Sequence, residues 1–414
     1  DRLRVLFVVQ GEGRGHLTQA LALDAALARA GHRVVGAVVG CSRFRPLPAY
    51  FADAFRGRLT CVETPVLVQD RRSRGVSAWR TALHTALRLP AYLQAVWRVR
   101  SAIRRHRPDV VVNFYDLIGN FALALIPDRP AHVVVGHHYI FLHPDFRPPP
   151  CRPLAAFGLR LLTRASALRA DLRLGLAFGP MRPHGRLRVV GPLLREAPAG
   201  GCGETVGGPA PRPWLVYVLN PGQAEDVRSW HRTRPGEPVL GFWDRPLPGP
   251  VALRPGLVFH PLDGRGYLDA LARCRGLATT AGFEAVAEAA ALGRPVLAVP
   301  TPGHVEQAWN AADAARAGVA RTASEFRLDA LMDAAARTPA DGAASFAAWV
   351  EAARADAVRW IEAAVRARRR GASLPERLPA AEPQRSGAPA CLKGVSGAGA
   401  GGLAVRGDPS ATPR

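Results

Sequence analysis

Two stretches of this 414-residue chain place polar side chains at glycine turns that open helices. The first, GEGRGH (Gly11–His16), follows an apolar strand pattern, and the second begins at Gly282. Glycine lets the backbone approach a ligand closely, and the free N–H groups of a helix start attract anions. We therefore expect Gly13, Gly15 and Gly282 to contact a phosphate-bearing ligand.

His16 is the residue of the first stretch that could do acid–base chemistry. A histidine beside a ligand cleft can act as a general base near neutral pH, and the alternative is a polar residue that only caps the helix. The spacing is GxGxG rather than GxGxxG, and no acid ends the second predicted strand. A dinucleotide-binding fold is therefore a poor match.

The second stretch places carboxylates and amides in two successive helices. Glu284 and Glu288 are four residues apart, so they share a helix face, and a carboxylate there can accept two ribose hydroxyls. A solvated acidic face is the plain alternative. A Pro-Thr-Pro-Gly-His loop follows, and His304, Glu306 and Gln307 then open another helix. These side chains either project into a cleft or cap the helix.

Strand and helix patterns alternate along most of the chain. Apolar strands are predicted at 3–9, 33–39, 109–113, 132–136, 172–176, 187–190, 214–219, 238–243, 257–259, 276–279 and 295–299. Helices are predicted at 17–30, 264–273, 283–292, 307–317, 325–337 and 343–370. This alternation predicts an α/β fold of two doubly wound Rossmann-like domains, whose ligand lies in the cleft between them at the strand carboxyl ends.

Composition places the domain boundaries. Residues 1–195 form the first domain, and the Gly/Pro-rich stretch 196–213 reads as a linker. Residues 214–340 form the second domain, and the helix 341–370 closes the ordered chain, with packing back on the first domain as one arrangement. The Gly/Ala/Pro/Ser-rich residues 371–414 are expected to be a disordered tail.

The joint pattern resembles the family 28 glycosyltransferases of the GT-B fold, one of which adds N-acetylglucosamine to a lipid-linked acceptor. Residues 279–318 are similar to the carboxy-terminal signature of that family, and Gly11–His16 to its amino-terminal GxGGH-type loop. The resemblance implies that Gly282 and Phe283 cradle a diphosphate and that Glu288 holds the ribose. It also implies that Gln307, in the string Gln307–Ala311, meets the nucleotide-sugar.

Further contacts are expected from the polar residues around these motifs. The donor-binding set would include Arg14, Glu284, His304, Glu306 and Asn310. The family's Gly/Ser-rich loop in the second domain is Asn220-Pro221-Gly222-Gln223 here, from which Asn220 and Gly222 would approach the phosphates. Because this loop departs from the family, and because Arg14 replaces a small residue, the peptidoglycan acceptor is not carried over.

These residues predict a glycosyltransferase that moves a sugar from a nucleotide-sugar, UDP-linked in the resemblance, to a hydroxyl acceptor. The chain contains no Asp-x-Asp motif, so helix N-termini would stabilise the leaving diphosphate without metal or cofactor. The reaction would invert the anomeric carbon in one displacement, with His16 as base. Asp116 would orient His16, or would only cap a loop.

Charge and cysteine usage bear on partners and location. By count, residues 1–195 contain 30 Arg against 11 acids, whereas residues 196–370 contain 20 Arg against 19. No nucleic-acid-binding motif accompanies the basic half, so we expect no nucleic acid partner. The six cysteines form no CxxC pair and no zinc spacing, and the first strand begins near Leu3. We therefore expect reduced thiols, no signal peptide and a cytoplasmic location.

Residues 80–107 mix apolar side chains with seven arginines in a basic amphipathic pattern. Such a segment could lie on anionic lipid at the inner face of the plasma membrane and face a lipid-linked or anionic acceptor. The alternative is a helix packed on the core with a solvated arginine face. His137, His138 and His143 have irregular spacing for metal ligands, and we interpret them as polar residues that line the cleft.

Two other functions fit the same fold. A nucleotide-sugar epimerase would need several acid/base carboxylates in the cleft and would turn over without an acceptor. A non-catalytic protein that only binds nucleotide-sugars is the second, because fold alone does not settle function.

Overall fold

The computed structural model describes residues 2–42, 46–65, 78–195, 212–243, 247–262, 264–337 and 340–378. These residues all belong to one compact unit of the chain. Most of the predicted linker (196–211) and the predicted tail from 379 onward lie outside the described residues.

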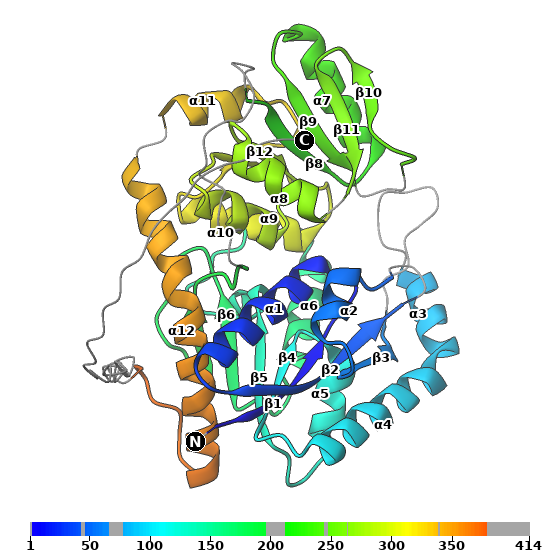
Figure 1. The fold of residues 1–414 in the computed structure, drawn as a ribbon, viewed down its shortest axis with the longest axis vertical. Helices are drawn as coiled ribbons and strands as arrows, with labels where there is room; N and C mark the ends of the chain where they lie inside the picture. The colour runs from blue at the N-terminus through cyan, green and yellow to red at the C-terminus, as the bar shows by residue number, and fades with distance from the viewer. Residues whose placement is uncertain are drawn as a thin grey trace, which may run out of the picture. The chain divides into compact units, whose positions relative to one another are not determined.

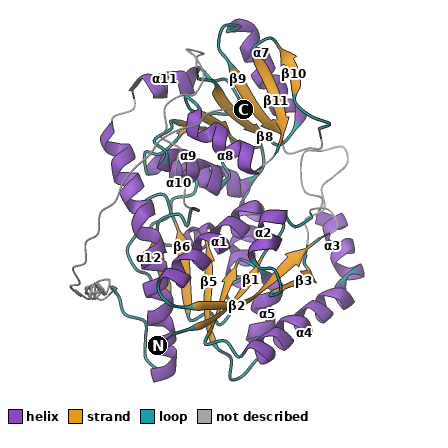
Figure 2. Ribbon diagram, in the orientation of Figure 1, coloured by secondary structure: helices purple, strands orange, loops and turns teal. Residues whose placement is uncertain are grey.

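The first domain is built on a parallel sheet of the order β3-β2-β1-β4-β5-β6-β7 (Figures 1 and 2). Except for the edge strand β3, its strands are mostly buried on both faces, and their sequences are therefore runs of apolar residues. Their bounds are Arg4–Val9 (β1), Arg33–Cys41 (β2), Leu59–Glu63 (β3), Val110–Phe114 (β4), Ala131–Gly136 (β5), Leu172–Leu176 (β6) and Leu187–Val190 (β7).

Helices connect these strands and cover both faces of the sheet (Figure 1). They are Arg14–Arg29 (α1), Ala49–Ala54 (α2), Ala78–Leu87 (α3), Leu89–His106 (α4), Leu117–Ala124 (α5), the 3-10 helix His137–Leu142 (η1) and Pro153–Ala165 (α6). The amphipathic segment 80–107 is divided at Arg88 because Pro90 has no N–H to donate, and it fits in the first turn of α4.

The second domain repeats the architecture with the strand order β10-β11-β9-β8-β12-β13-β14. All its neighbours pair in parallel except β10 and β11, which form a hairpin through Gly256. The strands are Trp214–Val218 (β8), Val239–Trp243 (β9), Val251–Arg254 (β10), Leu257–Pro261 (β11), Leu277–Thr279 (β12), Val296–Ala298 (β13) and Arg321–Thr322 (β14). The helices are Pro221–Thr233 (α7), Gly264–Arg273 (α8), Phe283–Ala291 (α9), Val305–Arg316 (α10) and Asp329–Arg337 (α11). The predicted fold of two doubly wound domains is confirmed.

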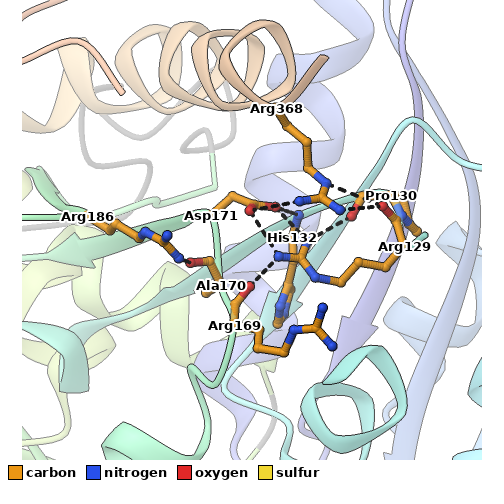
Figure 3. Close-up of polar contacts among 8 residues, drawn as sticks. All are labelled: Arg129, Pro130, His132, Arg169, Ala170, Asp171, Arg186 and Arg368. Carbon is orange, nitrogen blue, oxygen red and sulfur yellow. Dashed lines mark hydrogen bonds and ion pairs between the residues drawn. The ribbon is translucent and has the colours of Figure 1, made fainter. Parts of the chain in front are cut away.

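The last helix, Ala340–Arg370 (α12), returns to the first domain and packs on α1, β5, β6 and β7. Its buried face includes Ala353, Ala357 and Ile361. At its far end, the Arg368 guanidinium donates to the carbonyl of Arg129 and lies 3.5 Å from Asp171 (Figure 3).

Asp171 is the centre of this polar cluster. Its carboxylate also accepts from the nearly buried guanidinium of Arg129 at 2.6 Å and from the amide of His132 at 2.8 Å (Figure 3). Burial opposes ionisation of Asp171, but these donors outweigh it and lower its pKa.

We expected the disordered tail to begin at 371, and this boundary is too early. Arg188 donates to the carbonyl of Pro375 at 2.6 Å, and Leu374 and Leu378 pack on the core. Two leucines in an otherwise polar segment are enough to hold residues 371–378 on the first domain.

Candidate active site

Close packing requires glycine in the loop that follows β1. A Cβ at Gly11 would lie 2.0 Å from the carbonyl oxygen of Gly40 on β2, so no other residue fits there without a shift of the backbone. Gln10 accepts the amide of Gly13 at 3.2 Å, and α1 starts at Arg14 without a side-chain cap. The N–H of Gly13 is thus satisfied within the loop, and the N–H groups without a side-chain cap are those of Arg14 and Gly15 at the start of α1.

His16 lies in the first turn of α1, half-buried among other rings. Its ring is stacked 5.8 Å from Tyr115 and lies 5.8 Å from His138. Its Nδ1 has no hydrogen-bond partner within the described residues. Burial, with the nearby His138, lowers the pKa of His16 to about 4. The imidazole is therefore neutral at pH 7, the form that can take up a proton.

His138, in η1, links the two domains. Its ring stacks on Tyr115 with centroids 3.8 Å apart, and its Nε2 lies 3.3 Å from Oε1 of Glu306 in α10. Burial alone would raise the pKa of Glu306, but the neighbouring histidines outweigh it and hold that pKa at about 2. Glu306 is thus a fixed negative charge beside His138 and close to His16.

Asp116 occupies a different place from the one proposed for an orienting partner of His16. It caps α5, where Oδ1 accepts the amide of Gly119 at 2.6 Å, and its backbone amide donates to Asn113. Burial raises its pKa to about 6. No hydrogen bond joins Asp116 to His16 in the described structure, and the orienting role stays a prediction. The titratable groups that act on the pKa of His16 are His138 and Glu306.

The start of α9 is an open, strained turn. Ala281 adopts φ +64°, and Asn310 holds it by donating to its carbonyl at 3.1 Å. Gly282 then caps α9 without a side-chain bond, and a Cβ there would meet nothing within 4 Å. Phe283 packs on His137 of the first domain at 4.1 Å. The first N–H groups of α9 therefore have no side-chain cap, as an anion-binding helix start requires, and Asn310 supports the turn through the Ala281 carbonyl.

Glu284 joins α9 to α1. Its Oε1 accepts from Nε2 of Gln19 at 2.5 Å, and its Cγ would lie 2.8 Å from a Cβ at Gly15. Burial and the adjacent Glu288 raise the pKa of Glu284 well above its usual value. The glycine at position 15 thus allows the close approach of the two helix starts.

Glu288 lies one turn further along α9. Burial raises its pKa to about 7, and Arg195 from the end of the first domain opposes that rise. The Arg195 guanidinium lies over the ring of Tyr50 at 5.3 Å. The carboxyl group of Glu288 therefore ionises near neutral pH, close to an arginine. A perturbed pKa of this kind is expected of a side chain that binds a ligand.

The remaining predicted residues shape the loops. His304 caps α10 by accepting the amide of Gln307, and Gln307 accepts the amide of Thr301 at 2.8 Å. Asn220 forms a capping box with Gln223, so Asn220-Gly222 is the first turn of α7 rather than an open loop. Gln223 in turn donates to the Thr301 hydroxyl at 3.1 Å.

Four side chains of this site were not among the predicted residues: Gln19, Tyr50, Tyr115 and Arg195. Gln19 sits one turn after His16, and its polarity on a buried helix face was a usable signal. The other three approach from segments far apart in sequence, so only the fold brings them together. No group of three or more His, Cys, Asp or Glu residues with metal-binding geometry occurs within the described ranges.

The chain was compared with known protein families and curated proteins. Residues 214–339 match the sequence model of the family described as "Glycosyl transferase family 1". No curated protein matches the chain in sequence.

Several solved structures share the fold. A kitacinnamycin glycosyltransferase aligns with a TM-score of 0.60 and 17% identity over 88% of this chain and 100% of its own. The spinosyn rhamnosyltransferase SpnG with thymidine diphosphate gives 0.54 and 16% over 87% and 100%. MurG of Acinetobacter baumannii gives 0.51 and 15% over 87% and 99%.

These likenesses show that the chain has the GT-B fold. Together with the family match over the second domain, they indicate a glycosyltransferase enzyme.

Proposed function

We propose that this enzyme transfers a sugar from a nucleoside diphosphate sugar to a hydroxyl acceptor, with inversion and without a metal ion. One observation carries the proposal: the uncapped starts of α1 and α9 meet through Gln19 and Glu284, beside His16 and Glu288. Two helix N-termini converge on one place, which suits a diphosphate.

The residues divide the chemistry between the domains. The α9 turn at Gly282 and Phe283 receives the diphosphate, and Glu288 accepts hydroxyls of the ribose. His16, neutral at pH 7, removes the proton of the acceptor hydroxyl as the oxygen attacks the anomeric carbon. The leaving diphosphate gains negative charge, which the two helix starts and the guanidinium groups of Arg14 and Arg195 stabilise.

The donor base separates two candidates. The family 28 resemblance favours uridine, whereas SpnG has been solved with thymidine diphosphate. A thermal-shift panel of UDP- and dTDP-sugars, run once without EDTA and once after its addition, decides between them. The matched variants are Glu288→Ala and Glu351→Ala, the latter a strongly exposed acid on α12.

We expect one sugar nucleotide to stabilise the wild type and Glu351→Ala saturably, and Glu288→Ala not at all. Failure of every sugar nucleotide to bind would refute the proposal. Loss of binding on addition of EDTA would refute metal independence. Conversion of the donor to an epimer without acceptor would favour the epimerase, and binding without turnover of any acceptor would favour the binding protein.

Helices α3 and α4 of the first domain have the features of a surface that could contact a membrane. Helices α3 and α4 contain no Asp or Glu, and Leu93 and Trp97 are both 62% exposed on α4. The opposite face of α4 packs on the core through Tyr92 and Val99, and the lipid contact of the exposed face stays a proposal. No helix among the described residues is long and apolar enough to span a membrane.

We therefore propose that α4 rests on anionic lipid at the cytoplasmic face and brings the site to a lipid-linked acceptor. Sedimentation with phosphatidylglycerol vesicles tests this surface. Wild type and Trp97→Phe should sediment with them but not with phosphatidylcholine vesicles, and Trp97→Glu should remain in solution. Equal behaviour of the three proteins would refute the membrane contact.

A further inference from the structure

Two cysteines face each other on neighbouring strands of the first sheet. Cys41 is the last residue of β2, and Cys61 lies in the middle of β3, which runs parallel beside it. Their Sγ atoms are 2.6 Å apart, and both are free thiols. The two side chains therefore point at each other, although 19 residues separate them in the sequence.

The pair is open to small reagents. Cys61 is exposed and Cys41 half-buried, so either sulfur can be reached from solvent. Arg98 of α4 donates to the carbonyl of Cys61 at 3.4 Å, which places a guanidinium beside it. The hydrogen bond from Cys41 lowers the pKa of Cys61 to about 7 against the effect of burial. A partly exposed thiol that accepts a hydrogen bond from a second thiol has the environment of a reactive cysteine.

The pair is also coupled to the glycine loop. Gly40, which precedes Cys41, is the residue whose carbonyl lies against Gly11. The pKa of Cys41 is raised by its hydrogen bond to Cys61 and by burial, and Glu12 of the loop adds to this rise. A displacement at the end of β2 is therefore transmitted to the segment that carries His16.

A metal-binding role is disfavoured by the surroundings. A structural zinc ion needs four ligands, and within the described parts of the chain no third His, Cys, Asp or Glu completes a cluster here. Two thiols with no third ligand are suited to oxidation with each other.

We propose that Cys41 and Cys61 are a redox-active dithiol, which a small-molecule disulfide such as oxidised glutathione converts to an intramolecular disulfide bond. The Cys61 thiolate attacks one sulfur of glutathione disulfide and releases one glutathione thiolate. The Cys41 thiol, as it loses its proton, attacks the mixed disulfide and releases the second. Two electrons and two protons pass from the dithiol to the two glutathione molecules formed.

The test uses the full chain equilibrated at graded ratios of reduced to oxidised glutathione, then alkylated and digested with trypsin. Cys41 falls in the peptide 34–43 and Cys61 in 59–71, each with a single cysteine. We expect the two peptides to become disulfide-linked with one common midpoint, while Cys151 and Cys274 stay alkylated. Alkylation of Cys41 and Cys61 at every ratio that leaves Cys151 alkylated, or separate glutathione adducts on each, would overturn the proposal.

A second measurement reads the coupling to the loop. Amide hydrogen exchange in residues 10–16 should differ between oxidised and reduced wild type, and should not respond to oxidant in Cys61→Ser. An unchanged exchange in the linked protein would overturn the coupling. Neither measurement uses a sugar nucleotide, so absence of transfer would count against the proposed function and leave this result intact.

Discussion

The pH dependence of donor binding tests the role of Glu288 most directly. Its pKa of about 7 means that the carboxylate is about 90% ionised at pH 8 and about 9% at pH 6. Because only the ionised form accepts two ribose hydroxyls, donor affinity should fall about tenfold when the pH is lowered from 8 to 6. This change corresponds to about 1.4 kcal/mol.

Isothermal titration calorimetry with the sugar nucleotide selected by the thermal-shift panel measures this change. Glu288→Gln keeps the shape but cannot ionise, so its affinity should be weak and constant between pH 6 and pH 8. Wild-type affinity that varies by less than about twofold would refute the assigned ionisation. A full tenfold dependence in Glu288→Gln would assign it to another group.

The unliganded protein should show the opposite effect of ionisation. A carboxyl whose pKa is raised by burial contributes stability when protonated, and that contribution is lost as pH rises from about 4.5 through about 7. At about 1.4 kcal/mol per pH unit, Glu288→Gln should stabilise the protein at pH 8 by on the order of 3 kcal/mol. Thermal unfolding at pH 8 and pH 4 measures this gain, which should vanish at the lower pH.

Three further changes test the base, a buried ion pair and the glycine loop. His16→Ala should lower the transfer rate by about 10²–10⁴ with donor affinity unchanged, as measured by initial rates and calorimetry. Asp171→Ala should destabilise the fold by about 3–5 kcal/mol in urea unfolding, because it leaves the buried Arg129 unpaired. Gly11→Ala should cost at least about 1–3 kcal/mol in the same assay, because its Cβ would overlap the Gly40 carbonyl.

Matched controls define the contrary outcomes. Asp53→Ala removes an exposed partner of Arg56 and should change stability by less than about 1 kcal/mol. Gly158→Ala, in α6 with open space around it, should be neutral or stabilising by up to about 1 kcal/mol. If these variants lose as much stability as Asp171→Ala and Gly11→Ala, the contacts assigned to Asp171 and Gly11 are not responsible. Transfer that survives in His16→Ala would remove His16 as the base.

The sequence was enough for the elements whose signals are local. Strands buried on both faces, such as Val110–Phe114, must be continuous apolar runs. The start of a helix that follows a glycine turn, such as α9, can be located from that glycine in the sequence. The two helix starts without side-chain caps were therefore predictable. So was their place at the strand carboxyl ends, because a parallel sheet with helical crossovers leaves no other common edge.

Tertiary structure decided how these parts meet. Asp116 follows β4 by two residues, yet its side chain caps α5, and the negative charge that acts on His16 comes from Glu306 of the other domain. A local sequence pattern does not reveal which hydrogen-bond or ion-pair partner a polar side chain will have, since that depends on distances set by packing. The same holds for Arg195 beside Glu288, for Cys41 opposite Cys61, and for Leu374 and Leu378, which hold part of an apparently unstructured tail. Residue types and their spacing thus determined which chemical groups the chain offers, and the fold determined which of these groups lie together in one site.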